Sequence, residues 1–239
     1  MSDKALLILE RPWYSLSENP PQCSVIPFFQ SLERLNGNIA VYYSNFFERE
    51  SFRAALNHLM GHIHDSSIIY IASHGDGKYL AGNGIGQNLR LETALWQVFS
   101  AAANSRRVEG LLLGSCFLGQ NEDLITGLFE GSGLRWIVAY TASVEWLASS
   151  LIDMQIVSHL SNAKLKDLSS IEAMTSLFAA ALRLFNPYTE MATDNDERPV
   201  ELKDAIRIWV RRAGQGNHAV YDITEDVANE AWEFEAIED

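Results

Sequence analysis

The sequence predicts an α/β fold with a mostly parallel central sheet and helices on both faces. Short apolar runs of strand length, such as residues 5–9, 67–72 and 110–113, alternate with longer segments in which apolar residues recur at helical spacing. Strands that read as continuous apolar runs are typical of parallel sheets buried on both faces. A chain of 239 residues, 47% of them hydrophobic, is long enough to bury such a sheet.

The first half of the chain supplies three strands and two helices in alternation. Residues 5–9 are a short apolar run, and residues 25–35 have helical spacing that ends at Asn36-Gly37, a typical helix stop. Residues 39–43 are β-branched and aromatic, which predicts a strand. Residues 50–60 place apolar side chains on one side of a helix. Residues 67–72 (SIIYIA) predict a third, buried strand.

The same alternation continues through the middle of the chain. Residues 91–103 predict a helix, residues 110–113 a fourth strand, and residues 123–130 a short helix. Residues 135–140 predict a fifth strand, and residues 146–160 another helix. We assign this alternating part, residues 1–165, to one core domain.

After Lys166 the pattern changes, so we expect residues 166–239 to form a C-terminal helical and hairpin extension packed on the core. Its expected elements are a helix at 169–185, a polar and acidic loop at 186–199, two strands at 205–210 and 219–223 that pair as a hairpin or add to the sheet edge, and an acidic tail from 225 that contains Trp232 and Phe234.

Charge and composition exclude several classes of function. The net charge is −13, with 31 acidic against 18 basic residues, so nucleic acid and anionic membrane are poor partners. No apolar run approaches the roughly 20 residues of a membrane span, and the start MSDKALLILE reads as a buried strand rather than a signal peptide. Two cysteines, Cys23 and Cys116, favour a reducing cytoplasmic compartment over a disulfide framework.

Two neighbouring strands end in residues that can do chemistry. Residues 67–72 lead into Ser73-His74-Gly75, and residues 110–113 lead into Gly114-Ser115-Cys116. Because functional groups gather at the carboxyl edge of a parallel sheet, we expect the imidazole and the thiol to meet there. A nearby histidine can take the proton of a thiol and so generate a nucleophile. The N–H groups of Gly75 and Cys116 could stabilise a developing oxyanion.

Three segments around these residues resemble the caspase-like cysteine peptidases. SHGDGKYLAGNGIGQNLRLETAL is similar to their His-Gly segment, and VEGLLLGSCFLGQ to their cysteine segment. WIVAYTASVEWLASSLIDMQIVSHL resembles the strand and helix of the CHAT-type branch. In place of the caspase pattern Gln-Ala-Cys-x-Gly the chain has Gly114-Ser115-Cys116-Phe117-Leu118, and it lacks the Asp that metacaspases carry before their cysteine.

The resemblance implies a caspase-like fold and a cysteine endopeptidase with His74 as base and Cys116 as nucleophile, acting through a thioester acyl-enzyme without metal or organic cofactor. It also implies a protein or peptide substrate, with a partner effector protein as one candidate, in a bacterial defence or cell-death module. In the family, an acidic pocket selects a basic residue before the scissile bond, and a basic pocket selects Asp.

Charged residues near the strand ends are candidates for substrate binding, with Asp76 and Glu145 the first of them. The other acidic candidates are Glu122, Asp123 and Asp153, and the basic ones are Lys78, Arg90 and Arg135. The acidic surplus favours a cationic peptide substrate.

Other functions were weighed against this hypothesis. His58, His62 and His64 form a histidine cluster without the glutamate of the metalloprotease motif, so we expect no metal site. A catalytically silent caspase-like domain that binds a protein partner is the main alternative. A hydrolase that acts on something other than peptides is a weaker one.

Overall fold

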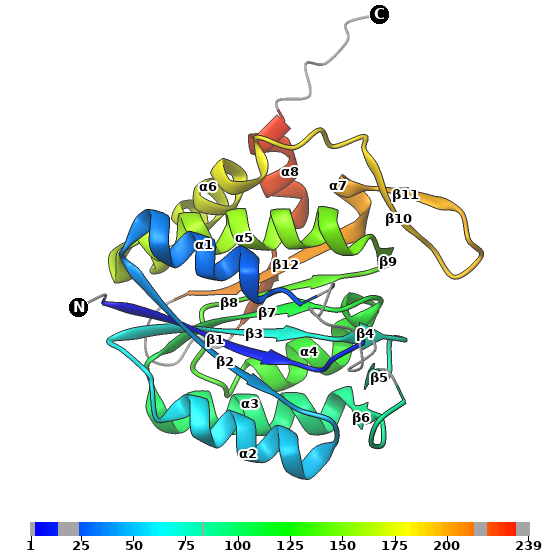
Figure 1. Cartoon of the computed structure of the whole chain (residues 1–239). Helices are drawn as coiled ribbons and strands as arrows, with labels where there is room; N and C mark the ends of the chain where they lie inside the picture. Colours follow the sequence, from blue (N-terminus) through cyan, green and yellow to red (C-terminus); the bar gives the residue numbers. More distant parts are fainter. Residues whose placement is uncertain (1–2, 14–23, 83, 213–218, 233–239) are drawn as a thin grey trace, which may run out of the picture.

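The computed structural model describes residues 3–13, 24–82, 84–212 and 219–232. Its central sheet consists of β1 (Lys4–Glu10), β2 (Ile39–Asn45), β3 (Ser66–Ala72), β7 (Val108–Gly114), β8 (Trp136–Tyr140), β12 (Ile206–Arg211) and β13 (Val220–Asp222). The strand order is β13-β12-β8-β7-β3-β1-β2 (Figure 1). The strands from β2 to β8 in this order are parallel, whereas β12 is antiparallel to β8, and β13 to β12.

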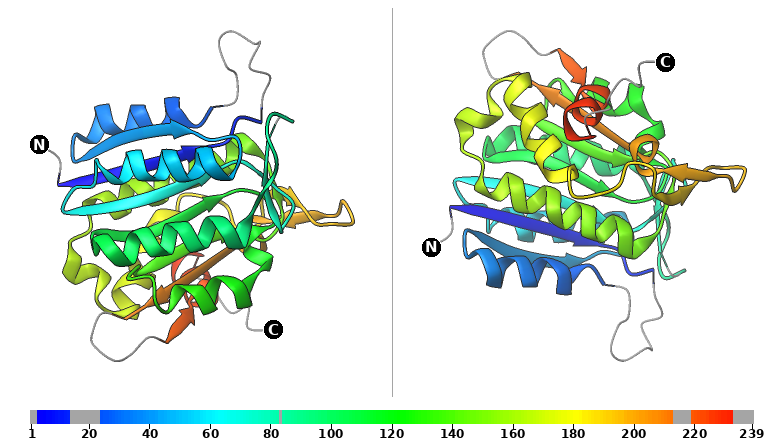
Figure 2. Two further views of the ribbon diagram at one scale, coloured as in Figure 1. Left: turned by 90° about the horizontal axis from the view of Figure 1, so that it is seen from below. Right: turned by 90° about the horizontal axis from the view of Figure 1, so that it is seen from above.

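Helices cover both faces of this sheet, as Figures 1 and 2 show. One face carries α1 (Ile26–Asn36), α5 (Trp146–Asn162), α6 (Ile171–Leu182) and α8 (Thr224–Trp232). The other face carries α2 (Arg49–Met60), α3 (Leu91–Ser105) and α4 (Glu122–Phe129). The predicted α/β class, with a mostly parallel sheet between two helical layers, is therefore confirmed.

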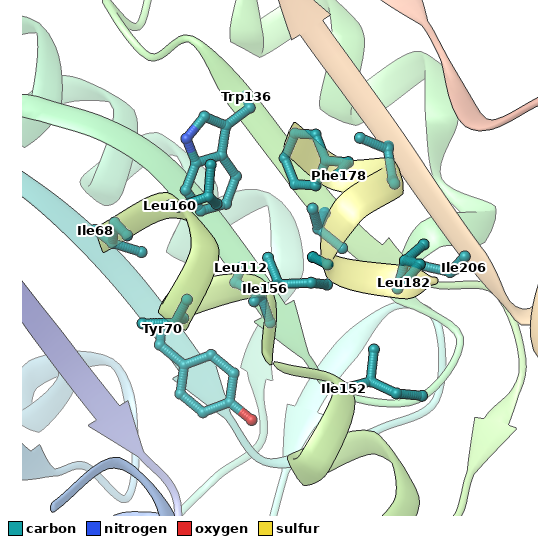
Figure 3. Close-up of a cluster of buried hydrophobic side chains, with 14 of the residues drawn as sticks. Ile68, Tyr70, Leu112, Trp136, Ile152, Ile156, Leu160, Phe178, Leu182 and Ile206 are labelled. Atoms are coloured by element: carbon teal, nitrogen blue, oxygen red, sulfur yellow. The ribbon is translucent and has the colours of Figure 1, made fainter. Parts of the chain in front are cut away.

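Each face of the sheet has its own apolar core, because successive strand residues point to opposite sides. In β1, Leu6 and Ile8 join the core under α1 and α5, while Leu7 and Leu9 join the core under α2 and α3. Figure 3 shows the first of these cores, where α5 and α6 pack on the sheet. Buried apolar area of this extent is the main stabilising contribution to the fold.

Local sequence signals explain where several helices begin and end. α1 has Pro27 in its first turn and ends at Gly37, which has a left-handed φ of 67°. α2 begins with a capping box, in which the Glu48 carboxylate accepts from the N–H groups of Glu50 and Ser51. The Ser170 hydroxyl accepts from the Ala173 N–H and caps α6.

Two small sheets stand at the edge where the parallel strands end (Figure 1). One consists of β4 (His74–Gly75), β5 (Tyr79–Ala81) and β6 (Leu89–Arg90), and the other of β9 (Ser143–Val144), β10 (Glu190–Thr193) and β11 (Pro199–Glu201). Both are antiparallel. They therefore frame the edge at which the sequence places its candidate residues.

The prediction of a plain loop at residues 186–199 is wrong, because β10 and the start of β11 form a hairpin there. The Asp194 carboxylate accepts from the N–H groups of Asp196 and Arg198, at 2.8 and 2.9 Å, and this builds the turn. Met191 and Ala192 are buried. Two apolar residues in a segment of mostly polar and charged residues are too few to show the alternating pattern that predicts a strand from sequence.

The C-terminal strands both pair with each other and extend the sheet, since β13 pairs with β12 and β12 with β8. A single helical turn, α7 (Leu202–Ala205), leads into β12. The acidic tail begins as helix α8, while Phe234 and Cys23 lie outside the described residues. The division of the chain at residue 165 stays a prediction. In the described part, no helix has both the length and the apolar character needed to cross a membrane.

Candidate active site

His74 and Cys116 lie side by side at the carboxyl edge of the central sheet. β3 and β7 are parallel neighbours, and their register pairs Ala72 with Gly114. His74 follows Ala72 by the same two positions by which Cys116 follows Gly114. Both residues line one pocket. The backbone therefore places His74 and Cys116 at adjacent strand ends, and their catalytic roles stay a prediction.

The loop that carries His74 is a tight hairpin. Asp76 holds its turn, because its carboxylate accepts from the N–H groups of Lys78 and Tyr79, at 3.0 and 2.8 Å. Gly77 has a φ of 84°, which residues with a side chain rarely adopt. Arg11, which follows β1, is buried, and its guanidinium donates to the carbonyl of Leu80 at 2.9 Å. This bond attaches the hairpin to the end of the central sheet.

The loop that carries Cys116 is held between the ends of β3 and β8. Phe117 has a left-handed φ of 61°, and its N–H donates to the carbonyl of Ala142 at 3.2 Å. The Gln120 side chain donates to the carbonyl of Thr141 at 2.7 Å. On the other side, the Asn121 amide donates to the carbonyl of Gly77 in the histidine loop. The two loops are therefore connected directly as well as through the sheet.

The residues next to the pair bring the two backbones together. The hydroxyls of Ser73 and Ser115, both buried, lie 3.0 Å apart and hydrogen-bond. Gly75 packs on Cys116 so closely that a Cβ at residue 75 would lie 2.2 Å from the Cys116 carbonyl oxygen and 3.1 Å from its nitrogen. Only glycine fits at position 75. This contact brings the two residues predicted to supply oxyanion-stabilising N–H groups against each other.

The Cys116 thiol and the His74 ring are not hydrogen-bonded to each other in the described part of the chain. The thiol donates to the carbonyl of Val144 at 4.0 Å and accepts from the Ser143 hydroxyl at 3.9 Å, both weak contacts. The His74 ring lies 6.0 Å from the Trp13 ring, centroid to centroid. Partial burial lowers the pKa of His74 below its ordinary 6.5, so the ring is neutral near pH 7 and can accept a proton.

The pocket that His74 and Cys116 share has a volume of about 60 Å³. Its lining is aromatic, aliphatic and hydroxylic, and comprises Trp13, Val25, Tyr70, Ser73, His74, Gly114, Cys116, Val144, Trp146, Ser149 and Ser150. Glu10 fixes one wall, because its buried carboxylate accepts from the Val25 N–H at 2.9 Å and the Ser24 hydroxyl at 2.8 Å. Burial raises the pKa of Glu10.

Behind the pocket lies a buried carboxyl group, Asp153 of α5. The hydroxyls of Tyr70 and Tyr140 each donate to one of its oxygens at 2.7 Å. Burial raises the pKa of Asp153 from 3.8 to about 7, although the two hydrogen bonds act in the opposite direction. Gly114 leaves space for the Tyr70 hydroxyl, since a Cβ there would lie 2.4 Å from that oxygen.

The predicted substrate-binding residues Asp76 and Glu145 lie outside the pocket lining. Both are exposed. Asp76 holds its turn, and Glu145 precedes α5 with its N–H donating to the carbonyl of Met191 at 2.9 Å. Their contribution to substrate binding stays a prediction.

From the α5 side of the site, sequence reasoning named Asp153 as a candidate for substrate binding but missed Ser149 and Ser150, although a signal was present. Trp146, Ser149, Ser150 and Asp153 recur at the spacing of one helix face, in a helix whose other buried positions are apolar except for Ser161. Polar residues on the buried face of a helix indicate that this face packs against a polar site and not against an apolar core.

Two histidines of the cluster pack against a tyrosine. The His62 ring stacks on Tyr42 at 4.6 Å, and the Tyr42 hydroxyl lies 3.1 Å from Nε2 of His64. Among the described residues there is no group of three His, Cys, Asp or Glu side chains that could hold a metal ion.

Comparison with known proteins gives a likeness of fold at low identity. No protein-family model and no curated protein matches the chain. One similar solved structure is that of a secreted C11 cysteine protease from Bacteroides thetaiotaomicron in complex with an irreversible peptide inhibitor. The identity is 10%, the TM-score is 0.46, and the match covers 88% of this chain but only 66% of that one. The chemistry of the site therefore has to be argued from its own residues.

Proposed function

We propose that the chain is a caspase-like cysteine peptidase, with Cys116 as nucleophile and His74 as general base and acid. The observation that carries this proposal is that thiol and imidazole line one pocket at the ends of two adjacent parallel strands. The lowered pKa of His74 supports the role of a base near neutral pH.

The proposed reaction has two halves. Sγ of Cys116 bonds to the carbonyl carbon of the scissile peptide while its proton passes to His74. The carbon–nitrogen bond breaks as His74 gives that proton to the leaving amine, which leaves a thioester on Cys116. Water then attacks the thioester, loses a proton to His74 and releases the acid, and the thiol is restored as the carbon–sulfur bond breaks.

The oxyanion of each tetrahedral intermediate needs donors already in place. In the described part of the chain the Cys116 N–H has no acceptor, and Gly75 packs against the same peptide group. We assign these two N–H groups to the oxyanion. The hydrogen bond between thiol and imidazole forms when substrate binds, because catalytic hydrogen bonds are often long before that point.

The alternative is a caspase-like domain without activity that binds a protein partner. One observation favours it, namely that the weak contacts of the thiol go to Ser143 and Val144 rather than to His74. Assignment to the CHAT-type branch, a role in bacterial defence against viruses, a partner effector protein as target and a cytoplasmic location rest on sequence features alone and are proposed on that basis.

The test is hydrolysis of a fluorogenic peptide library by the wild-type chain and by Cys116→Ala and His74→Ala. We expect both variants to lose activity by about 100-fold or more. His58→Ala is the matched control, since His58 is an exposed histidine on α2 far from the pocket, and it should keep full activity. Hydrolysis that survives in Cys116→Ala would refute the peptidase mechanism.

A further inference from the structure

The pocket beside Cys116 also bears on which substrates the site accepts. A peptide whose carbonyl carbon is attacked by Sγ must place a neighbouring side chain close to that sulfur. His74 and Cys116 both line the pocket of about 60 Å³. We propose that this pocket binds the side chain of the residue before the scissile bond, and that it selects an uncharged side chain of about three to five non-hydrogen atoms. This inference rests on the proposed peptidase function.

The size limit follows from the volume. A water-sized group needs roughly 10–15 Å³ of such space, so about 60 Å³ holds about four to six of them. The side chains of Val, Thr, Leu, Met, Asn and Gln fall within this limit. Those of Arg, Phe, Tyr and Trp exceed it. Trp13, Val25, Val144 and Trp146 form walls that favour apolar contact with the shorter ones.

The charge of the pocket excludes cationic side chains. Among the described residues that line the pocket none is acidic, and a cation that enters without a carboxylate partner loses its hydration with nothing to replace it. Two buried carboxyls lie behind the lining. Glu10 accepts from the Ser24 hydroxyl and the Val25 N–H, and Asp153 has both oxygens occupied by the hydroxyls of Tyr70 and Tyr140. A substrate lysine therefore meets the oxygen of Tyr70, not a carboxylate.

Acidic side chains are excluded by the same lining. No lysine or arginine is among the pocket residues, and the imidazole of His74 is needed for the reaction. When Asp153 is ionised, its negative charge behind Tyr70 further disfavours a substrate aspartate. The expectation of a cationic substrate was based on charged residues in the loops near the strand ends. None of those residues lines this pocket.

The walls are rigid enough to select. Val25 is held by the Glu10 carboxylate, and Trp146 packs edge-on against Phe28 at 5.3 Å between ring centroids. Ser150 lies on the α5 wall of the pocket and is 1% exposed, so its hydroxyl is held where a substrate Thr, Asn or Gln can hydrogen-bond to it.

The experiment measures kcat/KM for peptides that differ only in the residue before the scissile bond, namely Val, Leu, Asn, Lys, Arg, Asp and Phe. We expect the best uncharged medium-sized residue to exceed Arg, Lys and Asp by about 100-fold or more, and Phe by about 10-fold. Cleavage with Arg, Lys or Asp preferred would overturn the inference and leave the peptidase function intact. Absence of cleavage with every peptide would overturn the peptidase function, and the inference with it.

A wall variant tests the location of the selecting pocket. Trp146→Ala removes one wall and should raise kcat/KM for Phe relative to Leu by about 10-fold. Trp96→Ala is the matched control, because Trp96 lies on α3, is 58% exposed and does not line the pocket. The ratio should stay within about twofold of wild type in that variant. An unchanged ratio in a folded Trp146→Ala protein would place the selecting pocket elsewhere.

Discussion

Gly75 packs directly against the backbone of Cys116 at the site. A methyl group at residue 75 would lie 2.2 Å from the Cys116 carbonyl oxygen, and the other two nearest atoms are also Cys116 backbone, which cannot move aside as a flexible side chain could. We expect Gly75→Ala to lower the free energy of unfolding by about 1–3 kcal/mol, as overpacking does, and to reduce kcat/KM. Gly127→Ala is the control, because a Cβ there meets nothing within 4 Å. Equal thermal stability of the two variants would contradict the contact.

His74 should set the acidic limit of activity. Its pKa is lowered from 6.5 because partial burial disfavours the charged ring. The neutral, proton-accepting form therefore persists below pH 6.5, and kcat/KM should begin to fall only below that value. The pH profile of peptide hydrolysis measures this directly. An acidic limb centred above pH 6.5 would show that His74 is not the base or that a charged neighbour controls it.

At the scale of elements, the Asp153 carboxyl on α5 should make stability depend on pH. Its pKa is about 7 in the fold and 3.8 ordinarily, so the folded protein holds a proton that the unfolded chain releases. Stability from this group is therefore present at low pH and falls as the pH rises from about 4 to about 7. Asp153→Asn removes this dependence while its amide oxygen still accepts from a tyrosine.

Urea unfolding at pH 5 and pH 8 tests the Asp153 prediction. The free energy of unfolding of Asp153→Asn minus that of wild type should be more positive at pH 8 than at pH 5. Asp65→Asn, a change of an exposed aspartate at the opposite end of the sheet, should show no such trend. A difference that does not change with pH would mean that Asp153 titrates in the fold as it does in the unfolded chain.

The helices and strands that could be predicted from sequence are those whose own residues show a hydrophobic pattern. Apolar strands such as β3 and amphipathic helices such as α2 have that signal within a few residues. The strands β9 and β10 do not, because their pairing joins Ser143 and Val144 to residues almost 50 positions away. For the same reason the contacts of the Cys116 thiol with this small sheet could not be foreseen.

The position of His74 and Cys116 was predictable and the pocket beside them was not. His74 and Cys116 follow recognisable strands, so the rule for parallel sheets places them at one edge. The pocket walls come from five separate stretches of chain, including Trp13 and the polar face of α5. Tertiary packing alone decides which of these stretches reaches the thiol.

At the scale of the whole molecule, the C-terminal strands belong to the same sheet as the candidate site. Trp209 of β12 is 1% exposed and packs in the core shared with β7 and β8. We expect Trp209→Ala to cost about 3–5 kcal/mol and to lower the stability of the entire chain in one cooperative transition. Far-UV circular dichroism and tryptophan fluorescence should then give coincident urea curves. Two separated transitions would contradict this and support a division near residue 165.

The central claim is that His74 activates Cys116 as a nucleophile, and covalent labelling of Cys116 tests it most directly. A peptidyl acyloxymethyl ketone with leucine at the position that enters the pocket should form a thioether on Cys116, identified by mass spectrometry of the digested protein. We predict that His74→Ala lowers the rate constant of labelling by about 100-fold or more, while His58→Ala leaves it unchanged. Absence of a Cys116 adduct, or an equal rate in His74→Ala, would contradict the account.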